Sequence, residues 1–252
     1  MVSAADPILK ALLTGKSLDI PAVVAALPTE GALDALERAA RGSKRRAEHR
    51  LVVLVALGET PGPLAEGADA QVRSVLHRPR AEGRDPLLQH LKYRPASRRF
   101  CVDLCTLAAD RSDPDWAWAV DALGVLAPVG DAAASAVLLQ MTAGLDTPFV
   151  LVNALVRLRP PAAAPLFEAL RRHPEPRTVT YALWGLAALG ETDAIRALID
   201  RLDDGDVHTP NAYTPGQDRR AAQALCDVFG WPFEWAPEAV EATRARLAAQ
   251  RG

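Results

Sequence analysis

The chain repeats itself on a short period, and this feature constrains its fold more than any other. The pentapeptide ALGET occurs at Ala56–Thr60 and again at Ala188–Thr192, which is 132 residues later, or four steps of 33. If the Leu of each copy ends a first helix, equivalent positions follow along the chain: Leu27, Leu57, Leu91, Leu126, Leu158, Leu189 and Phe229. Their spacings of 30, 34, 35, 32, 31 and 40 residues predict a repeat of two helices.

A shared helical register follows three of these breaks. Ala163, Leu166, Phe167 and Leu170 have the i, i+3, i+4, i+7 spacing that places apolar side chains on one face of a helix. The same spacing recurs in two further segments, at Ala134, Val137, Leu138 and Met141 and at Ile195, Leu198, Ile199 and Leu202. Three second helices therefore share one apolar stripe.

The breaks have the chemistry of tight turns between helices. Gly58 and Gly190 can take the left-handed conformation that ends a helix, because glycine lacks a Cβ atom. Asp131, and either Thr192 or Asp193, can cap the helix that follows by accepting a backbone N–H. Each repeat is therefore predicted to be a helical hairpin.

The predicted fold class is all-α. The 49% of hydrophobic residues are mostly Ala, Leu and Val, and only 5% are aromatic, which favours helices over strands. A single hairpin cannot bury its apolar face, so copies must stack, and we expect a right-handed α-α superhelix in one domain, 1–252. A capping helix is expected at 5–14, followed by seven hairpins at 17–41, 44–78, 85–110, 114–143, 147–172, 177–203 and 218–249.

The segment A-L-G-E-T-D-A-I-R-A-L-I-D-R-L-D-D, from Ala188 to Asp204, resembles HEAT-like repeats, especially the short variety also found in phycobilin lyases. This resemblance spans most of the chain and implies an architecture, the α-solenoid. Because scaffolds, regulatory subunits and a few enzymes share that architecture, it does not carry a function.

Composition excludes several classes. Cys101, Cys105 and Cys226 are too few for a disulfide scaffold, so buried thiols in a reducing compartment are expected. The N-terminal segment has neither the basic start nor the apolar core of a signal peptide, and no apolar run reaches the length of a membrane span. We expect a cytoplasmic protein, from a bacterial gene of high GC content by its Ala- and Arg-rich usage, with no metal and no cofactor.

One loop interrupts the rhythm. The step of 40 residues from Leu189 to Phe229 exceeds the others by about 8 residues, and the surplus falls within 205–217. Loops that project from a rigid stack often carry recognition residues, although a plain surface insertion is the alternative. The predicted partner-binding residues of this loop are His208, Thr209, Asn211, Tyr213 and Gln217.

Charge is unevenly distributed along the chain. Residues 41–100 hold 13 Lys and Arg against 6 Asp and Glu, whereas residues 101–252 hold 13 against 20. If the cations of the first segment line one face, they form a track for nucleic acid or another polyanion, and the alternative is a set of solvated helix faces. The candidates for polyanion binding are Arg45, Arg46, Arg50, Arg78, Arg80, Arg84, Arg94, Arg98 and Arg99.

Two tryptophans precede an acid in DWAWAVDALG, at Trp116, Trp118 and Asp121. Two indoles beside a carboxylate can hold a cationic base, and the group is loosely similar to the Trp-Trp and Asp segment of the alkylpurine DNA glycosylases. Those enzymes are themselves built of HEAT-like repeats, so the resemblance implies a DNA-repair alternative. The other interpretation is structural, with one Trp packed and the other half-exposed.

The aromatic segment FGWPFEWAP, at 229–237, predicts an ordered non-helical turn that seals the last hairpin, or else an exposed contact patch. With no catalytic motif in the sequence, we expect a non-catalytic scaffold that binds a protein through its concave surface and the 205–217 loop. DNA binding or repair through the 41–100 region is the alternative. No membrane partner is expected.

Overall fold

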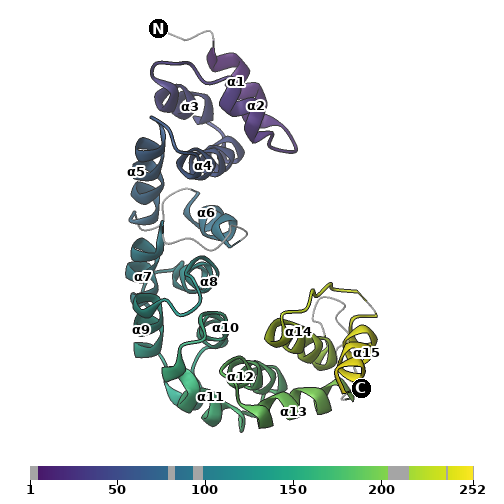
Figure 1. Cartoon of the computed structure of the whole chain (residues 1–252). Helices are drawn as coiled ribbons and strands as arrows, with labels where there is room; N and C mark the ends of the chain where they lie inside the picture. The colour runs from purple at the N-terminus through teal and green to yellow at the C-terminus, as the bar shows by residue number, and fades with distance from the viewer. Residues whose placement is uncertain (1–4, 79–82, 93–98, 204–215, 237, 252) are drawn as a thin grey trace. The chain divides into compact units, whose positions relative to one another are not determined.

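The computed structural model describes residues 5–78, 83–92, 99–203, 216–236 and 238–251, and every regular element in them is helical (Figure 1). There are fifteen α-helices and three short 3₁₀ helices, and these described ranges contain no strand. The prediction of an all-α chain is confirmed. No described helix is long and apolar enough to cross a membrane. The helices fall into two compact units, 1–126 and 127–252, which are taken in turn.

The first unit packs its helices in two rows. In one row α4 contacts α6 and α6 contacts α8, and in the other α5 contacts α7. The rows are joined where α4 packs on α5 and α7 on α8, while α3 rests on α1 and α4. The helices of this unit are α1 (Ala5–Thr14), α2 (Ile20–Ala25), α3 (Ala32–Ala40), α4 (Lys44–Glu59), α5 (Ala65–Leu76), α6 (Arg84–Leu91), α7 (Cys101–Ala109) and α8 (Trp116–Leu126).

The second unit has the same construction. Helix α12 lies at its centre, with α10 and α14 beside it and with α11 and α13 packed across it. Helix α9 packs on α10, and α15 covers α14. The elements are α9 (Ala132–Gln140), η1 (Gly144–Asp146), α10 (Phe149–Leu158), η2 (Pro161–Ala163), α11 (Ala164–Leu170), α12 (Pro176–Ala188), α13 (Thr192–Asp200), η3 (Arg201–Asp203), α14 (Gln217–Phe229) and α15 (Ala239–Arg251).

Each of the seven spans predicted as hairpins coincides with two of these α-helices, four of which extend one or two residues beyond the predicted bounds. The closest packing does not always lie within a span, however. Helices α4 and α5 pack together, as do α12 and α13, but α7 packs on α8, α9 on α10 and α11 on α12. A helix is therefore covered by its neighbours in both directions along the chain.

The predicted apolar stripes form the core. Leu138, Phe167 and Leu198, which occupy the i+4, i+4 and i+3 positions of their stripes, have no exposed surface. Every other stripe residue is buried or half-buried. Helices of seven to nine residues are too short to be stable alone, so burial of these stripes is what holds them in shape.

The predicted helix ends are confirmed at two positions. The Asp131 carboxylate accepts from the Ala134 N–H (3.0 Å) and so caps α9, and Gly190 has φ of +96° after α12. The prediction that Thr192 or Asp193 caps α13 is wrong. The N–H of Glu191 bonds back to the Leu186 carbonyl (3.0 Å) and α13 begins at Thr192, so Glu191 occupies the N-cap position and makes no side-chain cap hydrogen bond.

The prediction of a left-handed Gly58 is also wrong. Helix α4 continues through Gly58 to Glu59, so this glycine lies inside the helix. A Cβ atom here would collide with the ion pair between Arg99 and Asp69. Gly58 is therefore used for a close approach of side chains rather than for a turn.

Gly185 on α12 lies against the Phe167 ring of α11, because a Cβ atom at this glycine would be 2.5 Å from the ring. In an open helix Gly185→Ala would add about 1 kcal/mol of stability. Here the ring is fully buried, so overpacking dominates, and we expect the free energy of unfolding in urea to fall by about 1–3 kcal/mol.

The matched control is Gly62→Ala, since the nearest atom to its Cβ would be 3.9 Å away. That variant should stay within about 0.5 kcal/mol of the parent. Adding Phe167→Leu to Gly185→Ala should lessen the overpacking. A Gly185→Ala variant as stable as the parent would contradict this packing.

Candidate functional site

The basic segment of the sequence is only partly a surface feature. Arg45 and Arg78 are exposed, whereas Arg46 is half-buried and donates to the Arg41 carbonyl (2.5 Å). Arg50 donates to Gln71, and burial lowers its pKa, an effect that the charge of nearby Glu37 opposes. Arg80, Arg94 and Arg98 lie outside the described residues.

Arg84 and Arg99 are used inside the fold. Arg84 has no exposed surface, and its guanidinium pairs with Asp113 (2.6 Å) and Asp115 (3.4 Å). Burial raises the pKa of Asp115, and the charge of Arg84 lowers it in part. Arg99 pairs with Asp69 and donates to the Val55 carbonyl (2.9 Å), so it ties α5 to α4. Arg84 therefore cannot contact an external polyanion.

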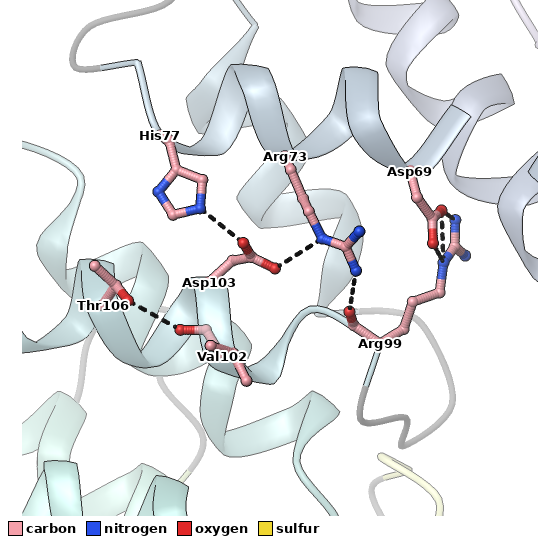
Figure 2. Close-up of polar contacts among 7 residues, drawn as sticks. All are labelled: Asp69, Arg73, His77, Arg99, Val102, Asp103 and Thr106. Carbon is pink, nitrogen blue, oxygen red and sulfur yellow. Dashed lines mark hydrogen bonds and ion pairs between the residues drawn. The ribbon is translucent and has the colours of Figure 1, made fainter. Parts of the chain in front are cut away.

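A polar cluster joins the exposed faces of α5 and α7 (Figure 2). Asp103 on α7 accepts from Arg73 Nε (3.3 Å), and one Asp103 oxygen lies 2.7 Å from His77 Nε2. Arg73 also donates to the Arg99 carbonyl (3.3 Å). Arg73 lies in the last turn of α5 and His77 is the C-cap residue four positions later, which is why both reach the same carboxylate.

The cluster leaves its donors partly in solvent. The side chains of Arg73 and His77 are 46% and 48% exposed, whereas that of Asp103 is 12% exposed. The nearby hydroxyl of Thr106 donates to the Val102 carbonyl (3.1 Å), so it bonds to its own helix rather than to His77 (Figure 2). The imidazole of His77 and the guanidinium of Arg73 are therefore held by Asp103 and remain partly accessible to solvent. The Thr106 hydroxyl is not positioned as a nucleophile activated by His77.

Sequence reasoning missed His77 and Asp103. A usable signal was present, because Arg73 and Asp103 are thirty residues apart, as are Asp69 and Arg99. A separation of thirty residues is close to the 30–35-residue spacing of the predicted helix pairs, so it is a distance at which opposite charges on neighbouring pairs can meet.

A lysine of the chain itself contacts the group formed by Trp116, Trp118 and Asp121. Lys92 Nζ lies 4.9 Å from the centre of the Trp118 ring and 2.5 Å from the Asp121 carboxylate. Trp116 donates its indole N–H to the Ala108 carbonyl (2.7 Å), and Trp118 is 38% exposed. Only one of the two indoles, that of Trp118, meets a cation beside Asp121, and this cation is the chain's own Lys92.

The predicted loop residues His208, Thr209, Asn211 and Tyr213 lie outside the described residues. Gln217 is described as the first residue of α14. Its side-chain oxygen accepts from the Thr180 hydroxyl (2.9 Å), which links α14 to α12.

An apolar groove of 510 Å³ lies in the first unit between α2, α4 and the Thr60–Leu64 turn. None of its twelve lining residues is charged, and Val24, at 39% exposed, stands at its edge. The turn that forms one wall contains Pro61 and Pro63, whose rings restrict the backbone. The groove is therefore a partly preformed apolar surface.

The aromatic segment after α14 is non-helical through residue 236, as predicted. Phe229 stacks on Trp231 (4.8 Å between ring centres) and Phe233 meets Trp235 edge-on (5.0 Å). Trp235 is 53% exposed, so the segment both covers the unit and offers a ring to solvent.

A pocket of 370 Å³ lies between this segment and α15. Arg246 bridges it by donating to the Pro232 carbonyl (2.7 Å).

Cys101 and Cys226 are buried thiols and Cys105 is half-buried. Within the described ranges, no three His, Cys, Asp or Glu side chains gather closely enough to hold a metal ion.

The ion pair of Lys92 and Asp121 should be worth more than a surface pair, because both side chains are largely buried. In a double-mutant cycle with Lys92→Met and Asp121→Asn, we expect a coupling free energy of about 1–3 kcal/mol from urea unfolding. The control pair is Arg196 and Asp193, which is exposed and should couple by less than about 0.5 kcal/mol. Equal coupling in the two pairs would contradict the internal role of Lys92.

Comparison with known proteins found no protein-family model that matches the sequence and no significant match among curated proteins.

Proposed function

We propose that this chain is a non-catalytic interaction module whose first unit binds an apolar segment of a partner protein. The observation that carries the proposal is the groove between α2, α4 and the Thr60–Leu64 turn, which is lined without a single charged residue. Apolar hollows of this kind, rimmed by polar surface, are typical of protein–protein contact sites.

The chemistry of the groove selects its occupant. A charged or strongly polar ligand would lose its hydration there without gaining ion pairs, so the groove disfavours nucleic acid and small anions. The apolar face of an amphipathic helix suits it better, since such a face inserts a row of side chains into a groove of this kind. Two prolines hold one wall, which lowers the entropy lost on binding.

The DNA-binding alternative has less support. Arg45, Arg78 and Lys44 are exposed and could contact phosphates. Arg84 is committed to buried carboxylates, however, and Lys92 occupies the tryptophan group. A salt-dependent mobility shift of the full chain with duplex DNA would favour this alternative over the interaction module.

We further propose that the helix pairs are HEAT-like repeats stacked as a right-handed superhelix of about seven hairpins. Two helices occur in each of the seven spans, and polar pairs in the first unit join residues thirty positions apart. Both features support a repeat in which each copy packs on the next. A solenoid of this type presents extended surfaces to partner proteins.

Site-specific photocrosslinking tests the groove. The chain, carrying benzoylphenylalanine in place of Val24, would be irradiated in cells that produce it. We expect one dominant adduct, whose crosslinked peptide belongs to an apolar segment of the partner. The control places the same group at Val102, which is 78% exposed but far along the unit on α7.

Matching adducts from both positions, or none from Val24, would overturn the groove as a binding site. An adduct between two copies of this chain would show that the groove binds a second copy instead of a different protein. An adduct with nucleic acid would favour the alternative function.

The 205–217 loop is proposed as a second contact on its sequence alone. Replacing His208, Thr209, Asn211 and Tyr213 together with alanine should weaken binding of the crosslinked partner at least tenfold, because their hydrogen-bonding groups and ring are lost. The melting temperature should not change. Arg196→Ala is the control, since Arg196 is exposed and pairs with Asp193 in the same helix. Unchanged affinity in the loop variant would remove the loop from the interface.

A further inference from the structure

We propose that the N-terminal turns of α12 and α14 form a binding site for a phosphoryl group. Arg177 is the second residue of α12 and Arg220 the fourth of α14. Helix N-termini carry partial positive charge, so arginine in the first turn is unfavourable there and an anion is favoured. Neither helix has a side-chain hydrogen bond from its N-cap residue.

Among the described residues, no carboxylate forms an ion pair with the buried Arg220. It is 7% exposed, and its hydrogen bond goes to the hydroxyl of Tyr181 (3.0 Å), which is neutral. Its Nε atom is buried without a hydrogen-bond partner. The acid in the same turn, Asp218, accepts from the N–H of Arg219 instead. Burying a charge without compensation is costly, so this position favours a negative ligand.

Arg177 adds a second guanidinium. Its Cζ atom lies 3.7 Å from the centre of the Phe149 ring, and its Nε atom is also buried without a partner. Burial lowers its pKa and so does the positive charge of Arg220, whereas Tyr181 and Glu175 oppose the shift. The carboxylate of Glu175 accepts from the Thr178 hydroxyl (2.8 Å). Two cations are therefore held close together at one place.

Aromatic rings fix both guanidiniums in position. Phe149 and Tyr181 pack edge to face (4.8 Å), with Arg177 over the first ring and Arg220 bonded to the hydroxyl of the second. Arg177 is half-buried, so solvent reaches the site from its side. A ligand would find both cations already ordered, and little side-chain entropy would be lost on binding.

The donors select the class of ligand. Guanidinium groups present forked N–H donors that match the oxygens of phosphate. A phosphate dianion neutralises two guanidinium charges, whereas a single carboxylate neutralises only one. The source could be free phosphate or a phosphorylated molecule. Both supply the same group to Arg177 and Arg220. This site belongs to the second unit and does not rest on the apolar groove.

The first experiment measures inorganic phosphate binding to the full chain by calorimetry and by its melting temperature. Ionic strength is held constant with sodium chloride, so that only specific binding distinguishes the samples. A ligand that binds the folded state alone stabilises it by an amount that rises with the logarithm of its concentration once this exceeds the dissociation constant. We expect a rise in melting temperature with phosphate, and dissociation constants at least tenfold higher for Arg177→Gln and Arg220→Met. Arg196→Gln is the control and should bind as the parent does. O-phosphoserine, used as a second probe, distinguishes a phosphorylated molecule from free phosphate by tighter binding.

A second readout separates binding from structure. Without phosphate, Arg220→Met removes an uncompensated buried charge and its repulsion of Arg177, so the variant should be at least as stable as the parent. In phosphate, the parent should become the more stable of the two. If phosphate leaves the parent unchanged, or shifts parent and variants equally, the proposal is overturned. A large loss of stability in Arg220→Met without phosphate would likewise assign Arg220 a structural role.

Discussion

Most helices in the described part of this chain are too short to hold their shape alone, and lateral burial is the interaction on which everything else depends. The longest of the described helices, α4, has sixteen residues, but several have nine or fewer. Isolated helices of these lengths are marginal in water. Residues such as Phe167 and Leu198 are therefore buried against the next helix rather than within their own, and a defect in one contact weakens its neighbours on both sides.

Lateral packing also determines where charge goes. Once apolar burial packs α5 beside α7, polar residues from the two segments face each other, and Asp69 with Arg99 and Arg73 with Asp103 are the result. These pairs fix how the two helices are aligned, because sliding one helix along the other would separate them. They also pair basic side chains with carboxylates inside the fold. The count of basic residues in 41–100 overstates the free positive surface, since Arg84 is wholly internal.

The two copies of ALGET show which features of this chain could be predicted from its sequence and which could not. Helical periodicity is local, so the stripes and most helix positions could be predicted. The conformation of a glycine depends on what approaches it, and that is not local. Gly190 is left-handed as expected, whereas Gly58 stays helical under the ion pair of Arg99 and Asp69. For the same reason the pairing of Lys92 with Trp118 was invisible, although the two tryptophans and Asp121 were singled out.

The surfaces suited to ligand binding are those where the chain's own residues do not pair its polar groups or cover its apolar side chains. Most polar groups near the tryptophans and along α5 and α7 are matched by the chain's own residues. The α2–α4 groove is different, because its apolar lining has no covering helix in the described part of the unit. Arg177 and Arg220 present the opposite chemistry, since they are charged groups held in place by neutral rings and a neutral hydroxyl. One deficit favours an apolar partner and the other an anion, so the two units are suited to ligands of different chemistry.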